Sequence, residues 1–240
     1  MHETLHIEGL RRAGTQLADA ATGRLDAPVP SCDDWTMADL VGHLGQVVSF
    51  WGGVGSGRIA DPRQHERPVP PAEDEIVDWL RDSVEAAAGE LESVDPQTPR
   101  WNWSGADQTA GWIARRMAHE SAVHAWDGTA AVGAAVVPPT DLAIDGVDEF
   151  FEVFAPRCAD RVEGPEATVH LHATDGDGEW LVRTAPGSIE FERGHAKGDV
   201  ALRGPASDLL LVCWRRVDPE QLELFGDAGA LRGLLDAVRI

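Results

Sequence analysis

The hydrophobic pattern of this 240-residue chain changes from helical to alternating spacing after Pro156, and this change strongly constrains the fold. Before it, apolar residues recur every three or four positions, which is the period of an amphipathic α-helix. After it, short runs alternate apolar and polar side chains, as half-buried strands do. We therefore expect a helical domain over residues 1–154 and a small α+β domain over residues 155–240.

Four proline-free segments of the first half have helical spacing. The second of them is expected to begin at Thr36, a favourable N-cap residue, with Asp39 as a short capping-box acid, and to end near Gly52. Four amphipathic helices joined by loops of mixed length predict a four-helix bundle, a fold whose core often holds metals. The predicted helices cover residues 2–23, 36–52, 73–93 and 108–131, with a further helix over 140–154.

The second half alternates strand patterns with Gly-rich turns. Runs rich in Val, Leu, Ile and Phe with period-2 alternation predict strands, and two longer apolar segments predict helices. The expected strands are 168–172, 179–183, 188–192, 200–203 and 221–225, and the expected helices are 205–216 and 228–238.

The composition argues against some classes of binding partner. The formal net charge is −21, and such a field repels nucleic-acid phosphates and anionic membrane surfaces. No apolar run approaches the roughly 20 residues of a membrane span. The N-terminus lacks a signal-type apolar core, and the three cysteines form no CxxC pair. We therefore expect a cytoplasmic monomer or homodimer with no nucleic-acid and no membrane partner.

Residues 115–127 carry acidic and imidazole side chains at a spacing that suits metal binding. In a helix, Glu120 and His124 lie one turn apart on one face, where both can bind a single divalent ion. Asp127 follows on the same face and is expected to orient His124. Two ligands hold a catalytic ion poorly, so a third is expected from elsewhere. His43, on or beside the apolar face of the second predicted helix, is the candidate.

Simpler explanations compete with this site. A lone histidine on an apolar face is more often a packed core residue, and acid–histidine pairs four residues apart are common on helix surfaces. His119 lies about 100° round the helix from Glu120 and should not share its site. Other histidines are expected at the surface, namely His2 and His6 near the terminus, His65 in a Pro-rich loop, and His170 with His172 as a pair on an exposed strand face that could also bind metal.

Two segments together resemble the paired motifs of the mycothiol-dependent maleylpyruvate isomerase family. Residues 35–47, WTMADLVGHLGQV, have the pattern W-T-x-x-D-L-x-x-H, and residues 112–127, WIARRMAHESAVHAWD, have R-R-x-x-H-E-x-x-V-H-x-x-D. Nearer the C-terminus, DVALRGPASDLLLVCWRRV and LELFGDAGALRGLLDAV are similar to the family's second domain. The resemblance covers nearly the whole chain. It implies a DinB-like N-terminal four-helix bundle and an α+β domain that resembles sterol-carrier proteins.

The resemblance also implies a chemistry. His43, Glu120 and His124 match the family positions that bind a zinc-like divalent metal. One Glu and two His leave an open position on a tetrahedral ion, where a bound thiol is held as a thiolate. In the family's reaction this thiol belongs to mycothiol. It adds to an activated carbon–carbon double bond, the resulting single bond rotates, and the thiol leaves, which converts cis to trans. The expected partners are this thiol and a small electrophilic substrate, and the same site could serve S-transfer.

The family's second domain further implies a functional arginine, which would hold a substrate carboxylate by paired hydrogen bonds. Arg216 is the candidate for this role. The local sequence C-W-R-R departs from the W-G-R pattern expected there, so Arg203 and Arg215 stay as alternatives.

Two other function classes are compatible with the sequence. The chain could be a non-catalytic protein that binds a small apolar ligand in its second domain, with a structural metal closed by a fourth protein ligand. It could also be a metal-dependent hydrolase acting through a bound water. That reaction needs a nearby base, and Asp39, one turn before His43, is the candidate.

Overall fold

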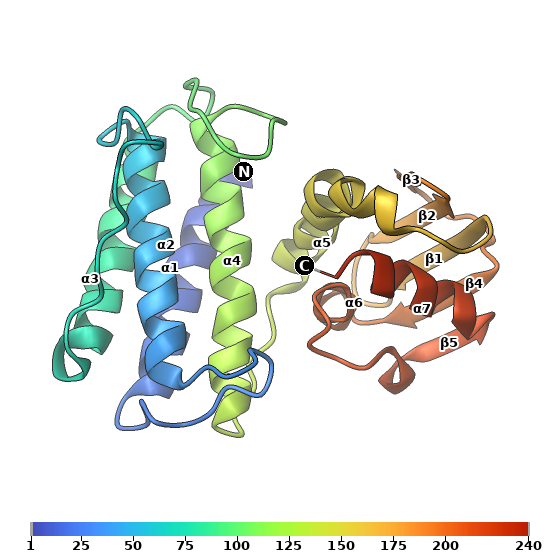
Figure 1. The fold of residues 1–240 in the computed structure, drawn as a ribbon, viewed down its shortest axis with the longest axis horizontal. Helices are drawn as coiled ribbons and strands as arrows, with labels where there is room; N and C mark the ends of the chain where they lie inside the picture. Colours follow the sequence, from blue (N-terminus) through green and yellow to red (C-terminus); the bar gives the residue numbers. More distant parts are fainter. Residues whose placement is uncertain (1, 240) are drawn as a thin grey trace. The chain divides into compact units, whose positions relative to one another are not determined.

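In the computed structural model, which describes residues 2–239, the N-terminal unit is the predicted four-helix bundle (Figure 1). Its helices are α1 (His2–Ala21), α2 (Met37–Ser56), α3 (Glu73–Glu92) and α4 (Ala110–Ala131). Helix α2 packs against α3 and α4, and α1 packs against the same two helices. The side chains of α2 and α4 can therefore meet inside the bundle. No helix among the described residues is long and apolar enough for a membrane span.

Capping residues determine where helix α2 begins and where it ends. The Thr36 side chain accepts from the backbone N–H of Asp39, and the Asp39 carboxylate accepts from that of Thr36 at 2.8 Å, so the predicted capping box is confirmed. The helix continues through Gly52 and stops at Gly57, whose φ of 87° is left-handed. The sequence predicts an end near Gly52, but this glycine instead allows close packing. A Cβ there would lie 2.7 Å from the Cβ of Ala87 on α3.

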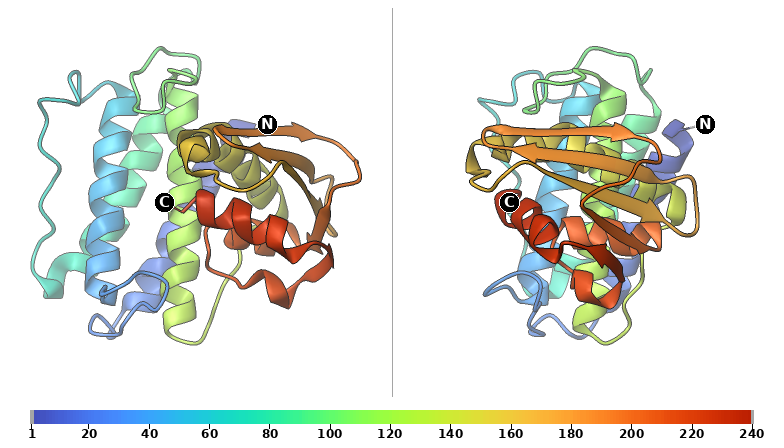
Figure 2. Two further views of the ribbon diagram at one scale, coloured as in Figure 1. Left: turned by 45° about the vertical axis from the view of Figure 1, so that its right-hand side comes forward. Right: turned by 90° about the vertical axis from the view of Figure 1, so that its right-hand side faces the viewer.

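The C-terminal unit is a five-stranded mixed sheet with helices packed on one face (Figure 2). The strand order is β3-β2-β1-β4-β5, and central strand β1 pairs antiparallel with β2 and parallel with β4. All five predicted strands and both predicted helices are present. They are β1 (Ala167–Ala173), β2 (Glu179–Ala185), β3 (Ser188–Arg193), β4 (Val200–Gly204), β5 (Glu223–Gly226), α6 (Ala206–Cys213) and α7 (Ala228–Ala237).

Strand β1 divides its side chains between the two faces of the sheet. Val169, Leu171 and Ala173 belong to the hydrophobic core shared with the helices. Because successive side chains of a strand point to opposite faces, His170 and His172 project from the other face. The alternation that predicts this strand thus also places two imidazoles side by side.

The boundary between the two units lies at Val137–Pro138, whereas the change of sequence pattern predicts it near Ala155. The difference is helix α5 (Thr140–Glu149), which packs against α6 and contributes to the core of the C-terminal unit. The predicted helix continues beyond α5 as a π-helical and then a 3₁₀ segment, ending at Arg161. A helical period indicates that a helix exists but not which unit buries its apolar face.

Candidate functional site

Helices α2 and α4 bring together the three side chains that the sequence suggests as metal ligands. His43 lies on α2, and Glu120 and His124 lie one turn apart on α4. The Oε1 atom of Glu120 is 3.3 Å from Nε2 of His43 and 3.4 Å from Nε2 of His124. The exposed side-chain fractions of His43, Glu120 and His124 are 30%, 23% and 11%, so a small molecule can reach the cluster from solvent.

The spacing of these atoms suits a single tetrahedral ion. Ligand atoms at the usual zinc distances of about 2.0–2.1 Å lie about 3.4 Å apart in a tetrahedral site. Both distances from Glu120 Oε1 agree with this separation. Among residues 2–239, no fourth His, Cys, Asp or Glu belongs to the group formed by His43, Glu120 and His124. The arrangement can hold a divalent ion and leave one coordination position open.

Arg116 is a buried residue of this site that sequence reasoning missed. It is 4% exposed, and its Nη2 donates to Oε2 of Glu120 at 2.6 Å. Burial would raise the pKa of Glu120, but the charge of Arg116 and the hydrogen bonds from His124 and His43 hold it well below its usual range. The carboxylate is therefore ionised and fixed at both oxygens. The four-residue spacing was visible in the sequence, but it is equally common in surface pairs.

Asp127 contacts Nδ1 of His124, the ring nitrogen that faces away from Glu120, as the sequence predicts. Its Oδ2 is 3.0 Å from Nδ1 of His124, and the residue has no exposed surface. Burial would lower the pKa of His124, but hydrogen bonds with Asp127, Cys32 and Glu120 raise it well above its usual value. Nδ1 faces Asp127 and Nε2 faces Glu120, so an ion bound at Nε2 would displace the proton on that nitrogen while the proton on Nδ1 stays shared with Asp127. This is the orientation that a metal-binding imidazole needs.

Two further residues of the loop before α2 lie at the site and were not predicted there. The ring of Trp35 packs against the imidazoles of His43 and His124, with centroid distances of 5.0 and 6.3 Å. Cys32 Sγ is 3.6 Å from Asp127 Oδ2, on the side of His124 away from Glu120. Cys32 is far from Asp127 in the sequence, and the two meet because the loop before α2 folds back to α4.

The remaining N-terminal histidines lie outside this group. His119 is 1% exposed and packs edge-on against His6, with ring centroids 5.9 Å apart, so its predicted separation from the site is confirmed. His6 is buried rather than solvated as expected, because α1 packs its length against α4. The side chain of His2 lies outside the described residues. His65 is exposed, as predicted.

Asp39, the candidate base for a hydrolytic reaction, is hydrogen-bonded to Thr36 in the cap at the start of α2. Its Oδ2 accepts from the Thr36 hydroxyl at 2.6 Å and from the Thr36 backbone N–H at 2.8 Å. These hydrogen bonds lower the pKa of Asp39 below its usual value. A carboxylate with a lowered pKa is a weak general base near neutral pH. The structure therefore gives the hydrolytic alternative no support from this residue.

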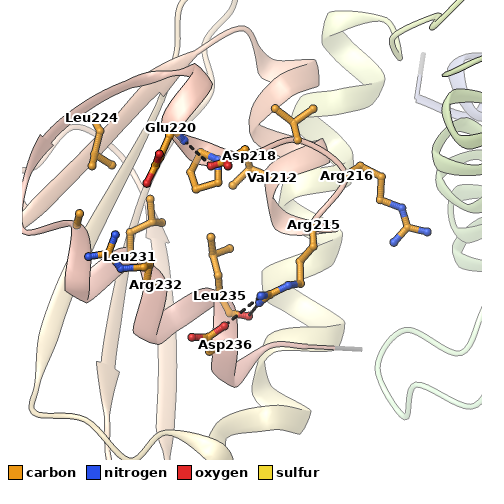
Figure 3. A pocket seen from close by; sticks show the side chains of 13 residues that line it. Val212, Arg215, Arg216, Asp218, Glu220, Leu224, Leu231, Arg232, Leu235 and Asp236 are labelled. Carbon is orange, nitrogen blue, oxygen red and sulfur yellow. Dashed lines mark hydrogen bonds and ion pairs between the residues drawn. The ribbon is translucent and has the colours of Figure 1, made fainter. Parts of the chain in front are cut away.

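The C-terminal unit contains a cavity of about 480 Å³ beside α7, with both Arg215 and Arg216 in its wall (Figure 3). Such a volume suits a small molecule. Arg215 donates to Asp236 at 3.1 Å, and Arg203, outside the cavity wall, pairs with Glu223 at 2.8 Å. The side chain of Arg216 extends away from Arg215 and Asp236 in Figure 3. Its Nη1 donates to the carbonyl oxygen of Trp214 at 2.9 Å, so each of the three candidate arginines has a hydrogen-bond partner within the C-terminal unit.

Two family models match the chain. The model of the Mycothiol maleylpyruvate isomerase N-terminal domain matches residues 7–127, and the MDMPI C-terminal domain model matches residues 141–233. The chain belongs to the mycothiol maleylpyruvate isomerase family. The resemblance inferred from the two N-terminal motifs is confirmed, and the first match includes His43, Glu120 and His124.

Solved structures of this family share the fold. The crystal structure of the mycothiol-dependent maleylpyruvate isomerase aligns with a TM-score of 0.57 and 12% sequence identity, over 95% of this chain and 93% of that one. A histidine-to-alanine variant of that enzyme aligns with a TM-score of 0.56 and 12% identity, over 87% of each chain. At this identity, the likeness establishes the fold alone. No curated protein sequence matches the chain.

Proposed function

We propose that this member of the mycothiol maleylpyruvate isomerase family is a divalent-metal-dependent enzyme that uses mycothiol either to isomerise a small electrophile or, by S-transfer, to form a conjugate with one. The observation that carries the proposal is the position of Glu120 Oε1, which lies 3.3 and 3.4 Å from imidazole nitrogens on two different helices. Family membership supports the thiol, because the related solved enzyme is named for its dependence on mycothiol.

The donor set supports zinc as the ion. Two imidazoles and one carboxylate are ligands that zinc accepts, and a set of three is typical of catalytic rather than structural sites. An ion held by His43, Glu120 and His124 would supply a Lewis acid that keeps a coordinated thiol deprotonated near neutral pH. The ionised state of Glu120 and the outward hydrogen bond of His124 favour such binding.

The surrounding residues would hold these ligands in place for catalysis. Arg116 fixes the second oxygen of Glu120, so that Oε1 stays between the two imidazoles. Asp127 fixes the ring of His124 from behind. Trp35 packs against both imidazole rings and limits the positions that they can take.

We further propose that Arg216 binds a carboxylate of the substrate by paired hydrogen bonds. The family resemblance points to an arginine of the second domain. Arg216 lines the cavity beside α7, as Arg215 does, whereas Arg203 lies outside the cavity wall. We place the enzyme in the cytoplasm, since its three cysteines form no disulfide.

Thiol dependence provides the test of this function. Zinc-loaded protein is incubated with maleylpyruvate, and separately with a bimane electrophile, with and without mycothiol, and the products are separated by chromatography. We expect the trans isomer or the mycothiol conjugate to form much faster with enzyme and mycothiol together than with mycothiol alone, and not with enzyme alone. Equal turnover without mycothiol, or no product from either substrate with it, would contradict the proposal.

A further inference from the structure

The C-terminal sheet carries a second group of potential metal ligands on the face opposite its core. His170, His172, Glu179 and His195 each offer a ligand atom, and these atoms all lie within 4.8 Å of one another. All four residues lie within the C-terminal unit. We refer to them as the sheet cluster.

Strand pairing brings the first three members together. His170 and His172 are two residues apart on β1, so both side chains leave the same face of the sheet. In the antiparallel register, His172 lies directly opposite Glu179 of β2. As a result, Oε2 of Glu179 is 3.3 Å from Nε2 of His170, and its Oε1 is 3.2 Å from Nδ1 of His172.

A chain crossover supplies the fourth member. Strand β3 ends at Arg193, level with the start of β2, while β4 begins beside Val169 near the other end of β1. Residues 194–199 therefore run back across β2 and β1 to reach β4. This crossover brings Nδ1 of His195 to 2.7 Å from Oε2 of Glu179.

Contacts of the crossover explain why His170 is buried. The ring of His195 lies 5.3 Å from that of His170 and 6.5 Å from that of His172, measured between centroids. At its far end the crossover contacts β1, where a Cβ on Gly198 would lie 3.0 Å from the backbone nitrogen of His170. His170 is only 6% exposed. The sequence predicts an exposed pair, and this prediction is wrong for His170 because the crossover covers it.

The sheet cluster gathers three imidazoles around one carboxylate, and both oxygens of Glu179 contact histidine nitrogens. Three nitrogen donors and one oxygen donor form a ligand set that a divalent ion such as zinc accepts. Such an ion would bind the three imidazoles in their neutral form together with the ionised carboxylate.

We propose that His170, His172, Glu179 and His195 bind a second divalent metal ion, with zinc as the fitting metal. Four protein ligands fill a tetrahedral shell, which is typical of structural rather than catalytic sites. Oε2 of Glu179 lies 3.3 Å from His170 and 2.7 Å from His195, while its Oε1 lies 3.2 Å from His172. With all four ligand atoms within 4.8 Å of one another, small side-chain shifts bring them to the separation of about 3.4 Å that a tetrahedral ion requires. The ion fastens the crossover of residues 194–199 onto the sheet.

The rate at which a protease cuts the crossover at one site tests whether a metal ion fastens it to the sheet. Lys197 is the only lysine of the chain, and it is an exposed residue of the crossover, so endoproteinase Lys-C can cut the full-length protein only there. Chelator-treated protein is digested with and without added zinc. Zinc is expected to slow cleavage at least about tenfold, because the bound crossover must detach before it enters the protease.

Two ligand variants and one control make the test specific. His172→Ala and the isosteric Glu179→Gln leave residues 194–199 unchanged, and we expect zinc to give neither variant protection. His43→Ala, in the other unit, should keep the full protection. Zinc analysis by mass spectrometry should find two ions per chain in the unaltered protein and one in each of the three variants. Unchanged cleavage on adding zinc, or equal protection of Glu179→Gln, would overturn the second site.

Discussion

Replacement of His43 by alanine is expected to lower the zinc affinity of the bundle site by more than about 100-fold and to abolish mycothiol-dependent turnover. Loss of a residue that only supports a ligand typically costs about 10–100-fold in affinity. His43 is itself the ligand from the second helix, so its loss should cost more. Without it, Glu120 and His124 keep their place on α4 but hold an ion by two bonds.

Competition with a chelator of known affinity measures this loss, and His65→Ala is its matched control. Both variants remove one imidazole, but His65 is exposed and lies outside the ligand group. The side chain of His43 is itself 30% exposed, so its removal should leave the bundle folded, which circular dichroism can verify. If His43→Ala bound zinc at the bundle site as tightly as His65→Ala, His43 would not be a ligand.

Asp127→Asn is expected to weaken zinc binding by about 10–100-fold while leaving all three ligands in place. The carboxylate contacts Nδ1 of His124 at 3.0 Å, the ring nitrogen that faces away from Glu120. An amide of the same shape carries no charge, so it supports the basicity of the imidazole less. It can also donate to Nδ1, which would favour the tautomer whose proton sits on Nε2, where the ion should bind.

Cys32→Ala provides the comparison for this variant. Cys32 contacts the same Asp127 oxygen at 3.6 Å but does not belong to the ligand group. Its replacement should change zinc affinity far less than Asp127→Asn does. Measured by the same chelator competition, equal affinities for Asp127→Asn and the unaltered protein would show that the hydrogen bond to His124 does not support metal binding.

The helices and strands could be predicted because each depends on a local pattern. The capping residues Thr36 and Asp39 mark the start of α2 in the sequence, and the structure shows both hydrogen bonds. Its end could not be predicted, because Gly52 reads as a helix breaker until the close approach of α3 is known. The domain boundary was missed for a similar reason, since only the packing of α5 reveals which unit it belongs to.

The pair on α4 could be predicted from its spacing, but the residues around it could not. Arg116 lies within the same helix, yet a buried charge and a surface charge look alike in a sequence. Trp35 and Cys32 reach the site because the loop before α2 folds back, which no local pattern encodes. His195 joins the sheet cluster through the strand order, and this order is set by long-range pairing.

Anomalous diffraction at the zinc edge, from crystals of zinc-loaded protein soaked with mycothiol, tests the central claim most directly. We predict a peak in the bundle at about 2.0–2.2 Å from Nε2 of His43, Nε2 of His124 and a carboxylate oxygen of Glu120, with the thiol sulfur at about 2.3 Å. A bundle peak that lacks any one of these three protein ligands, or whose fourth position is filled by another side chain, would contradict the account.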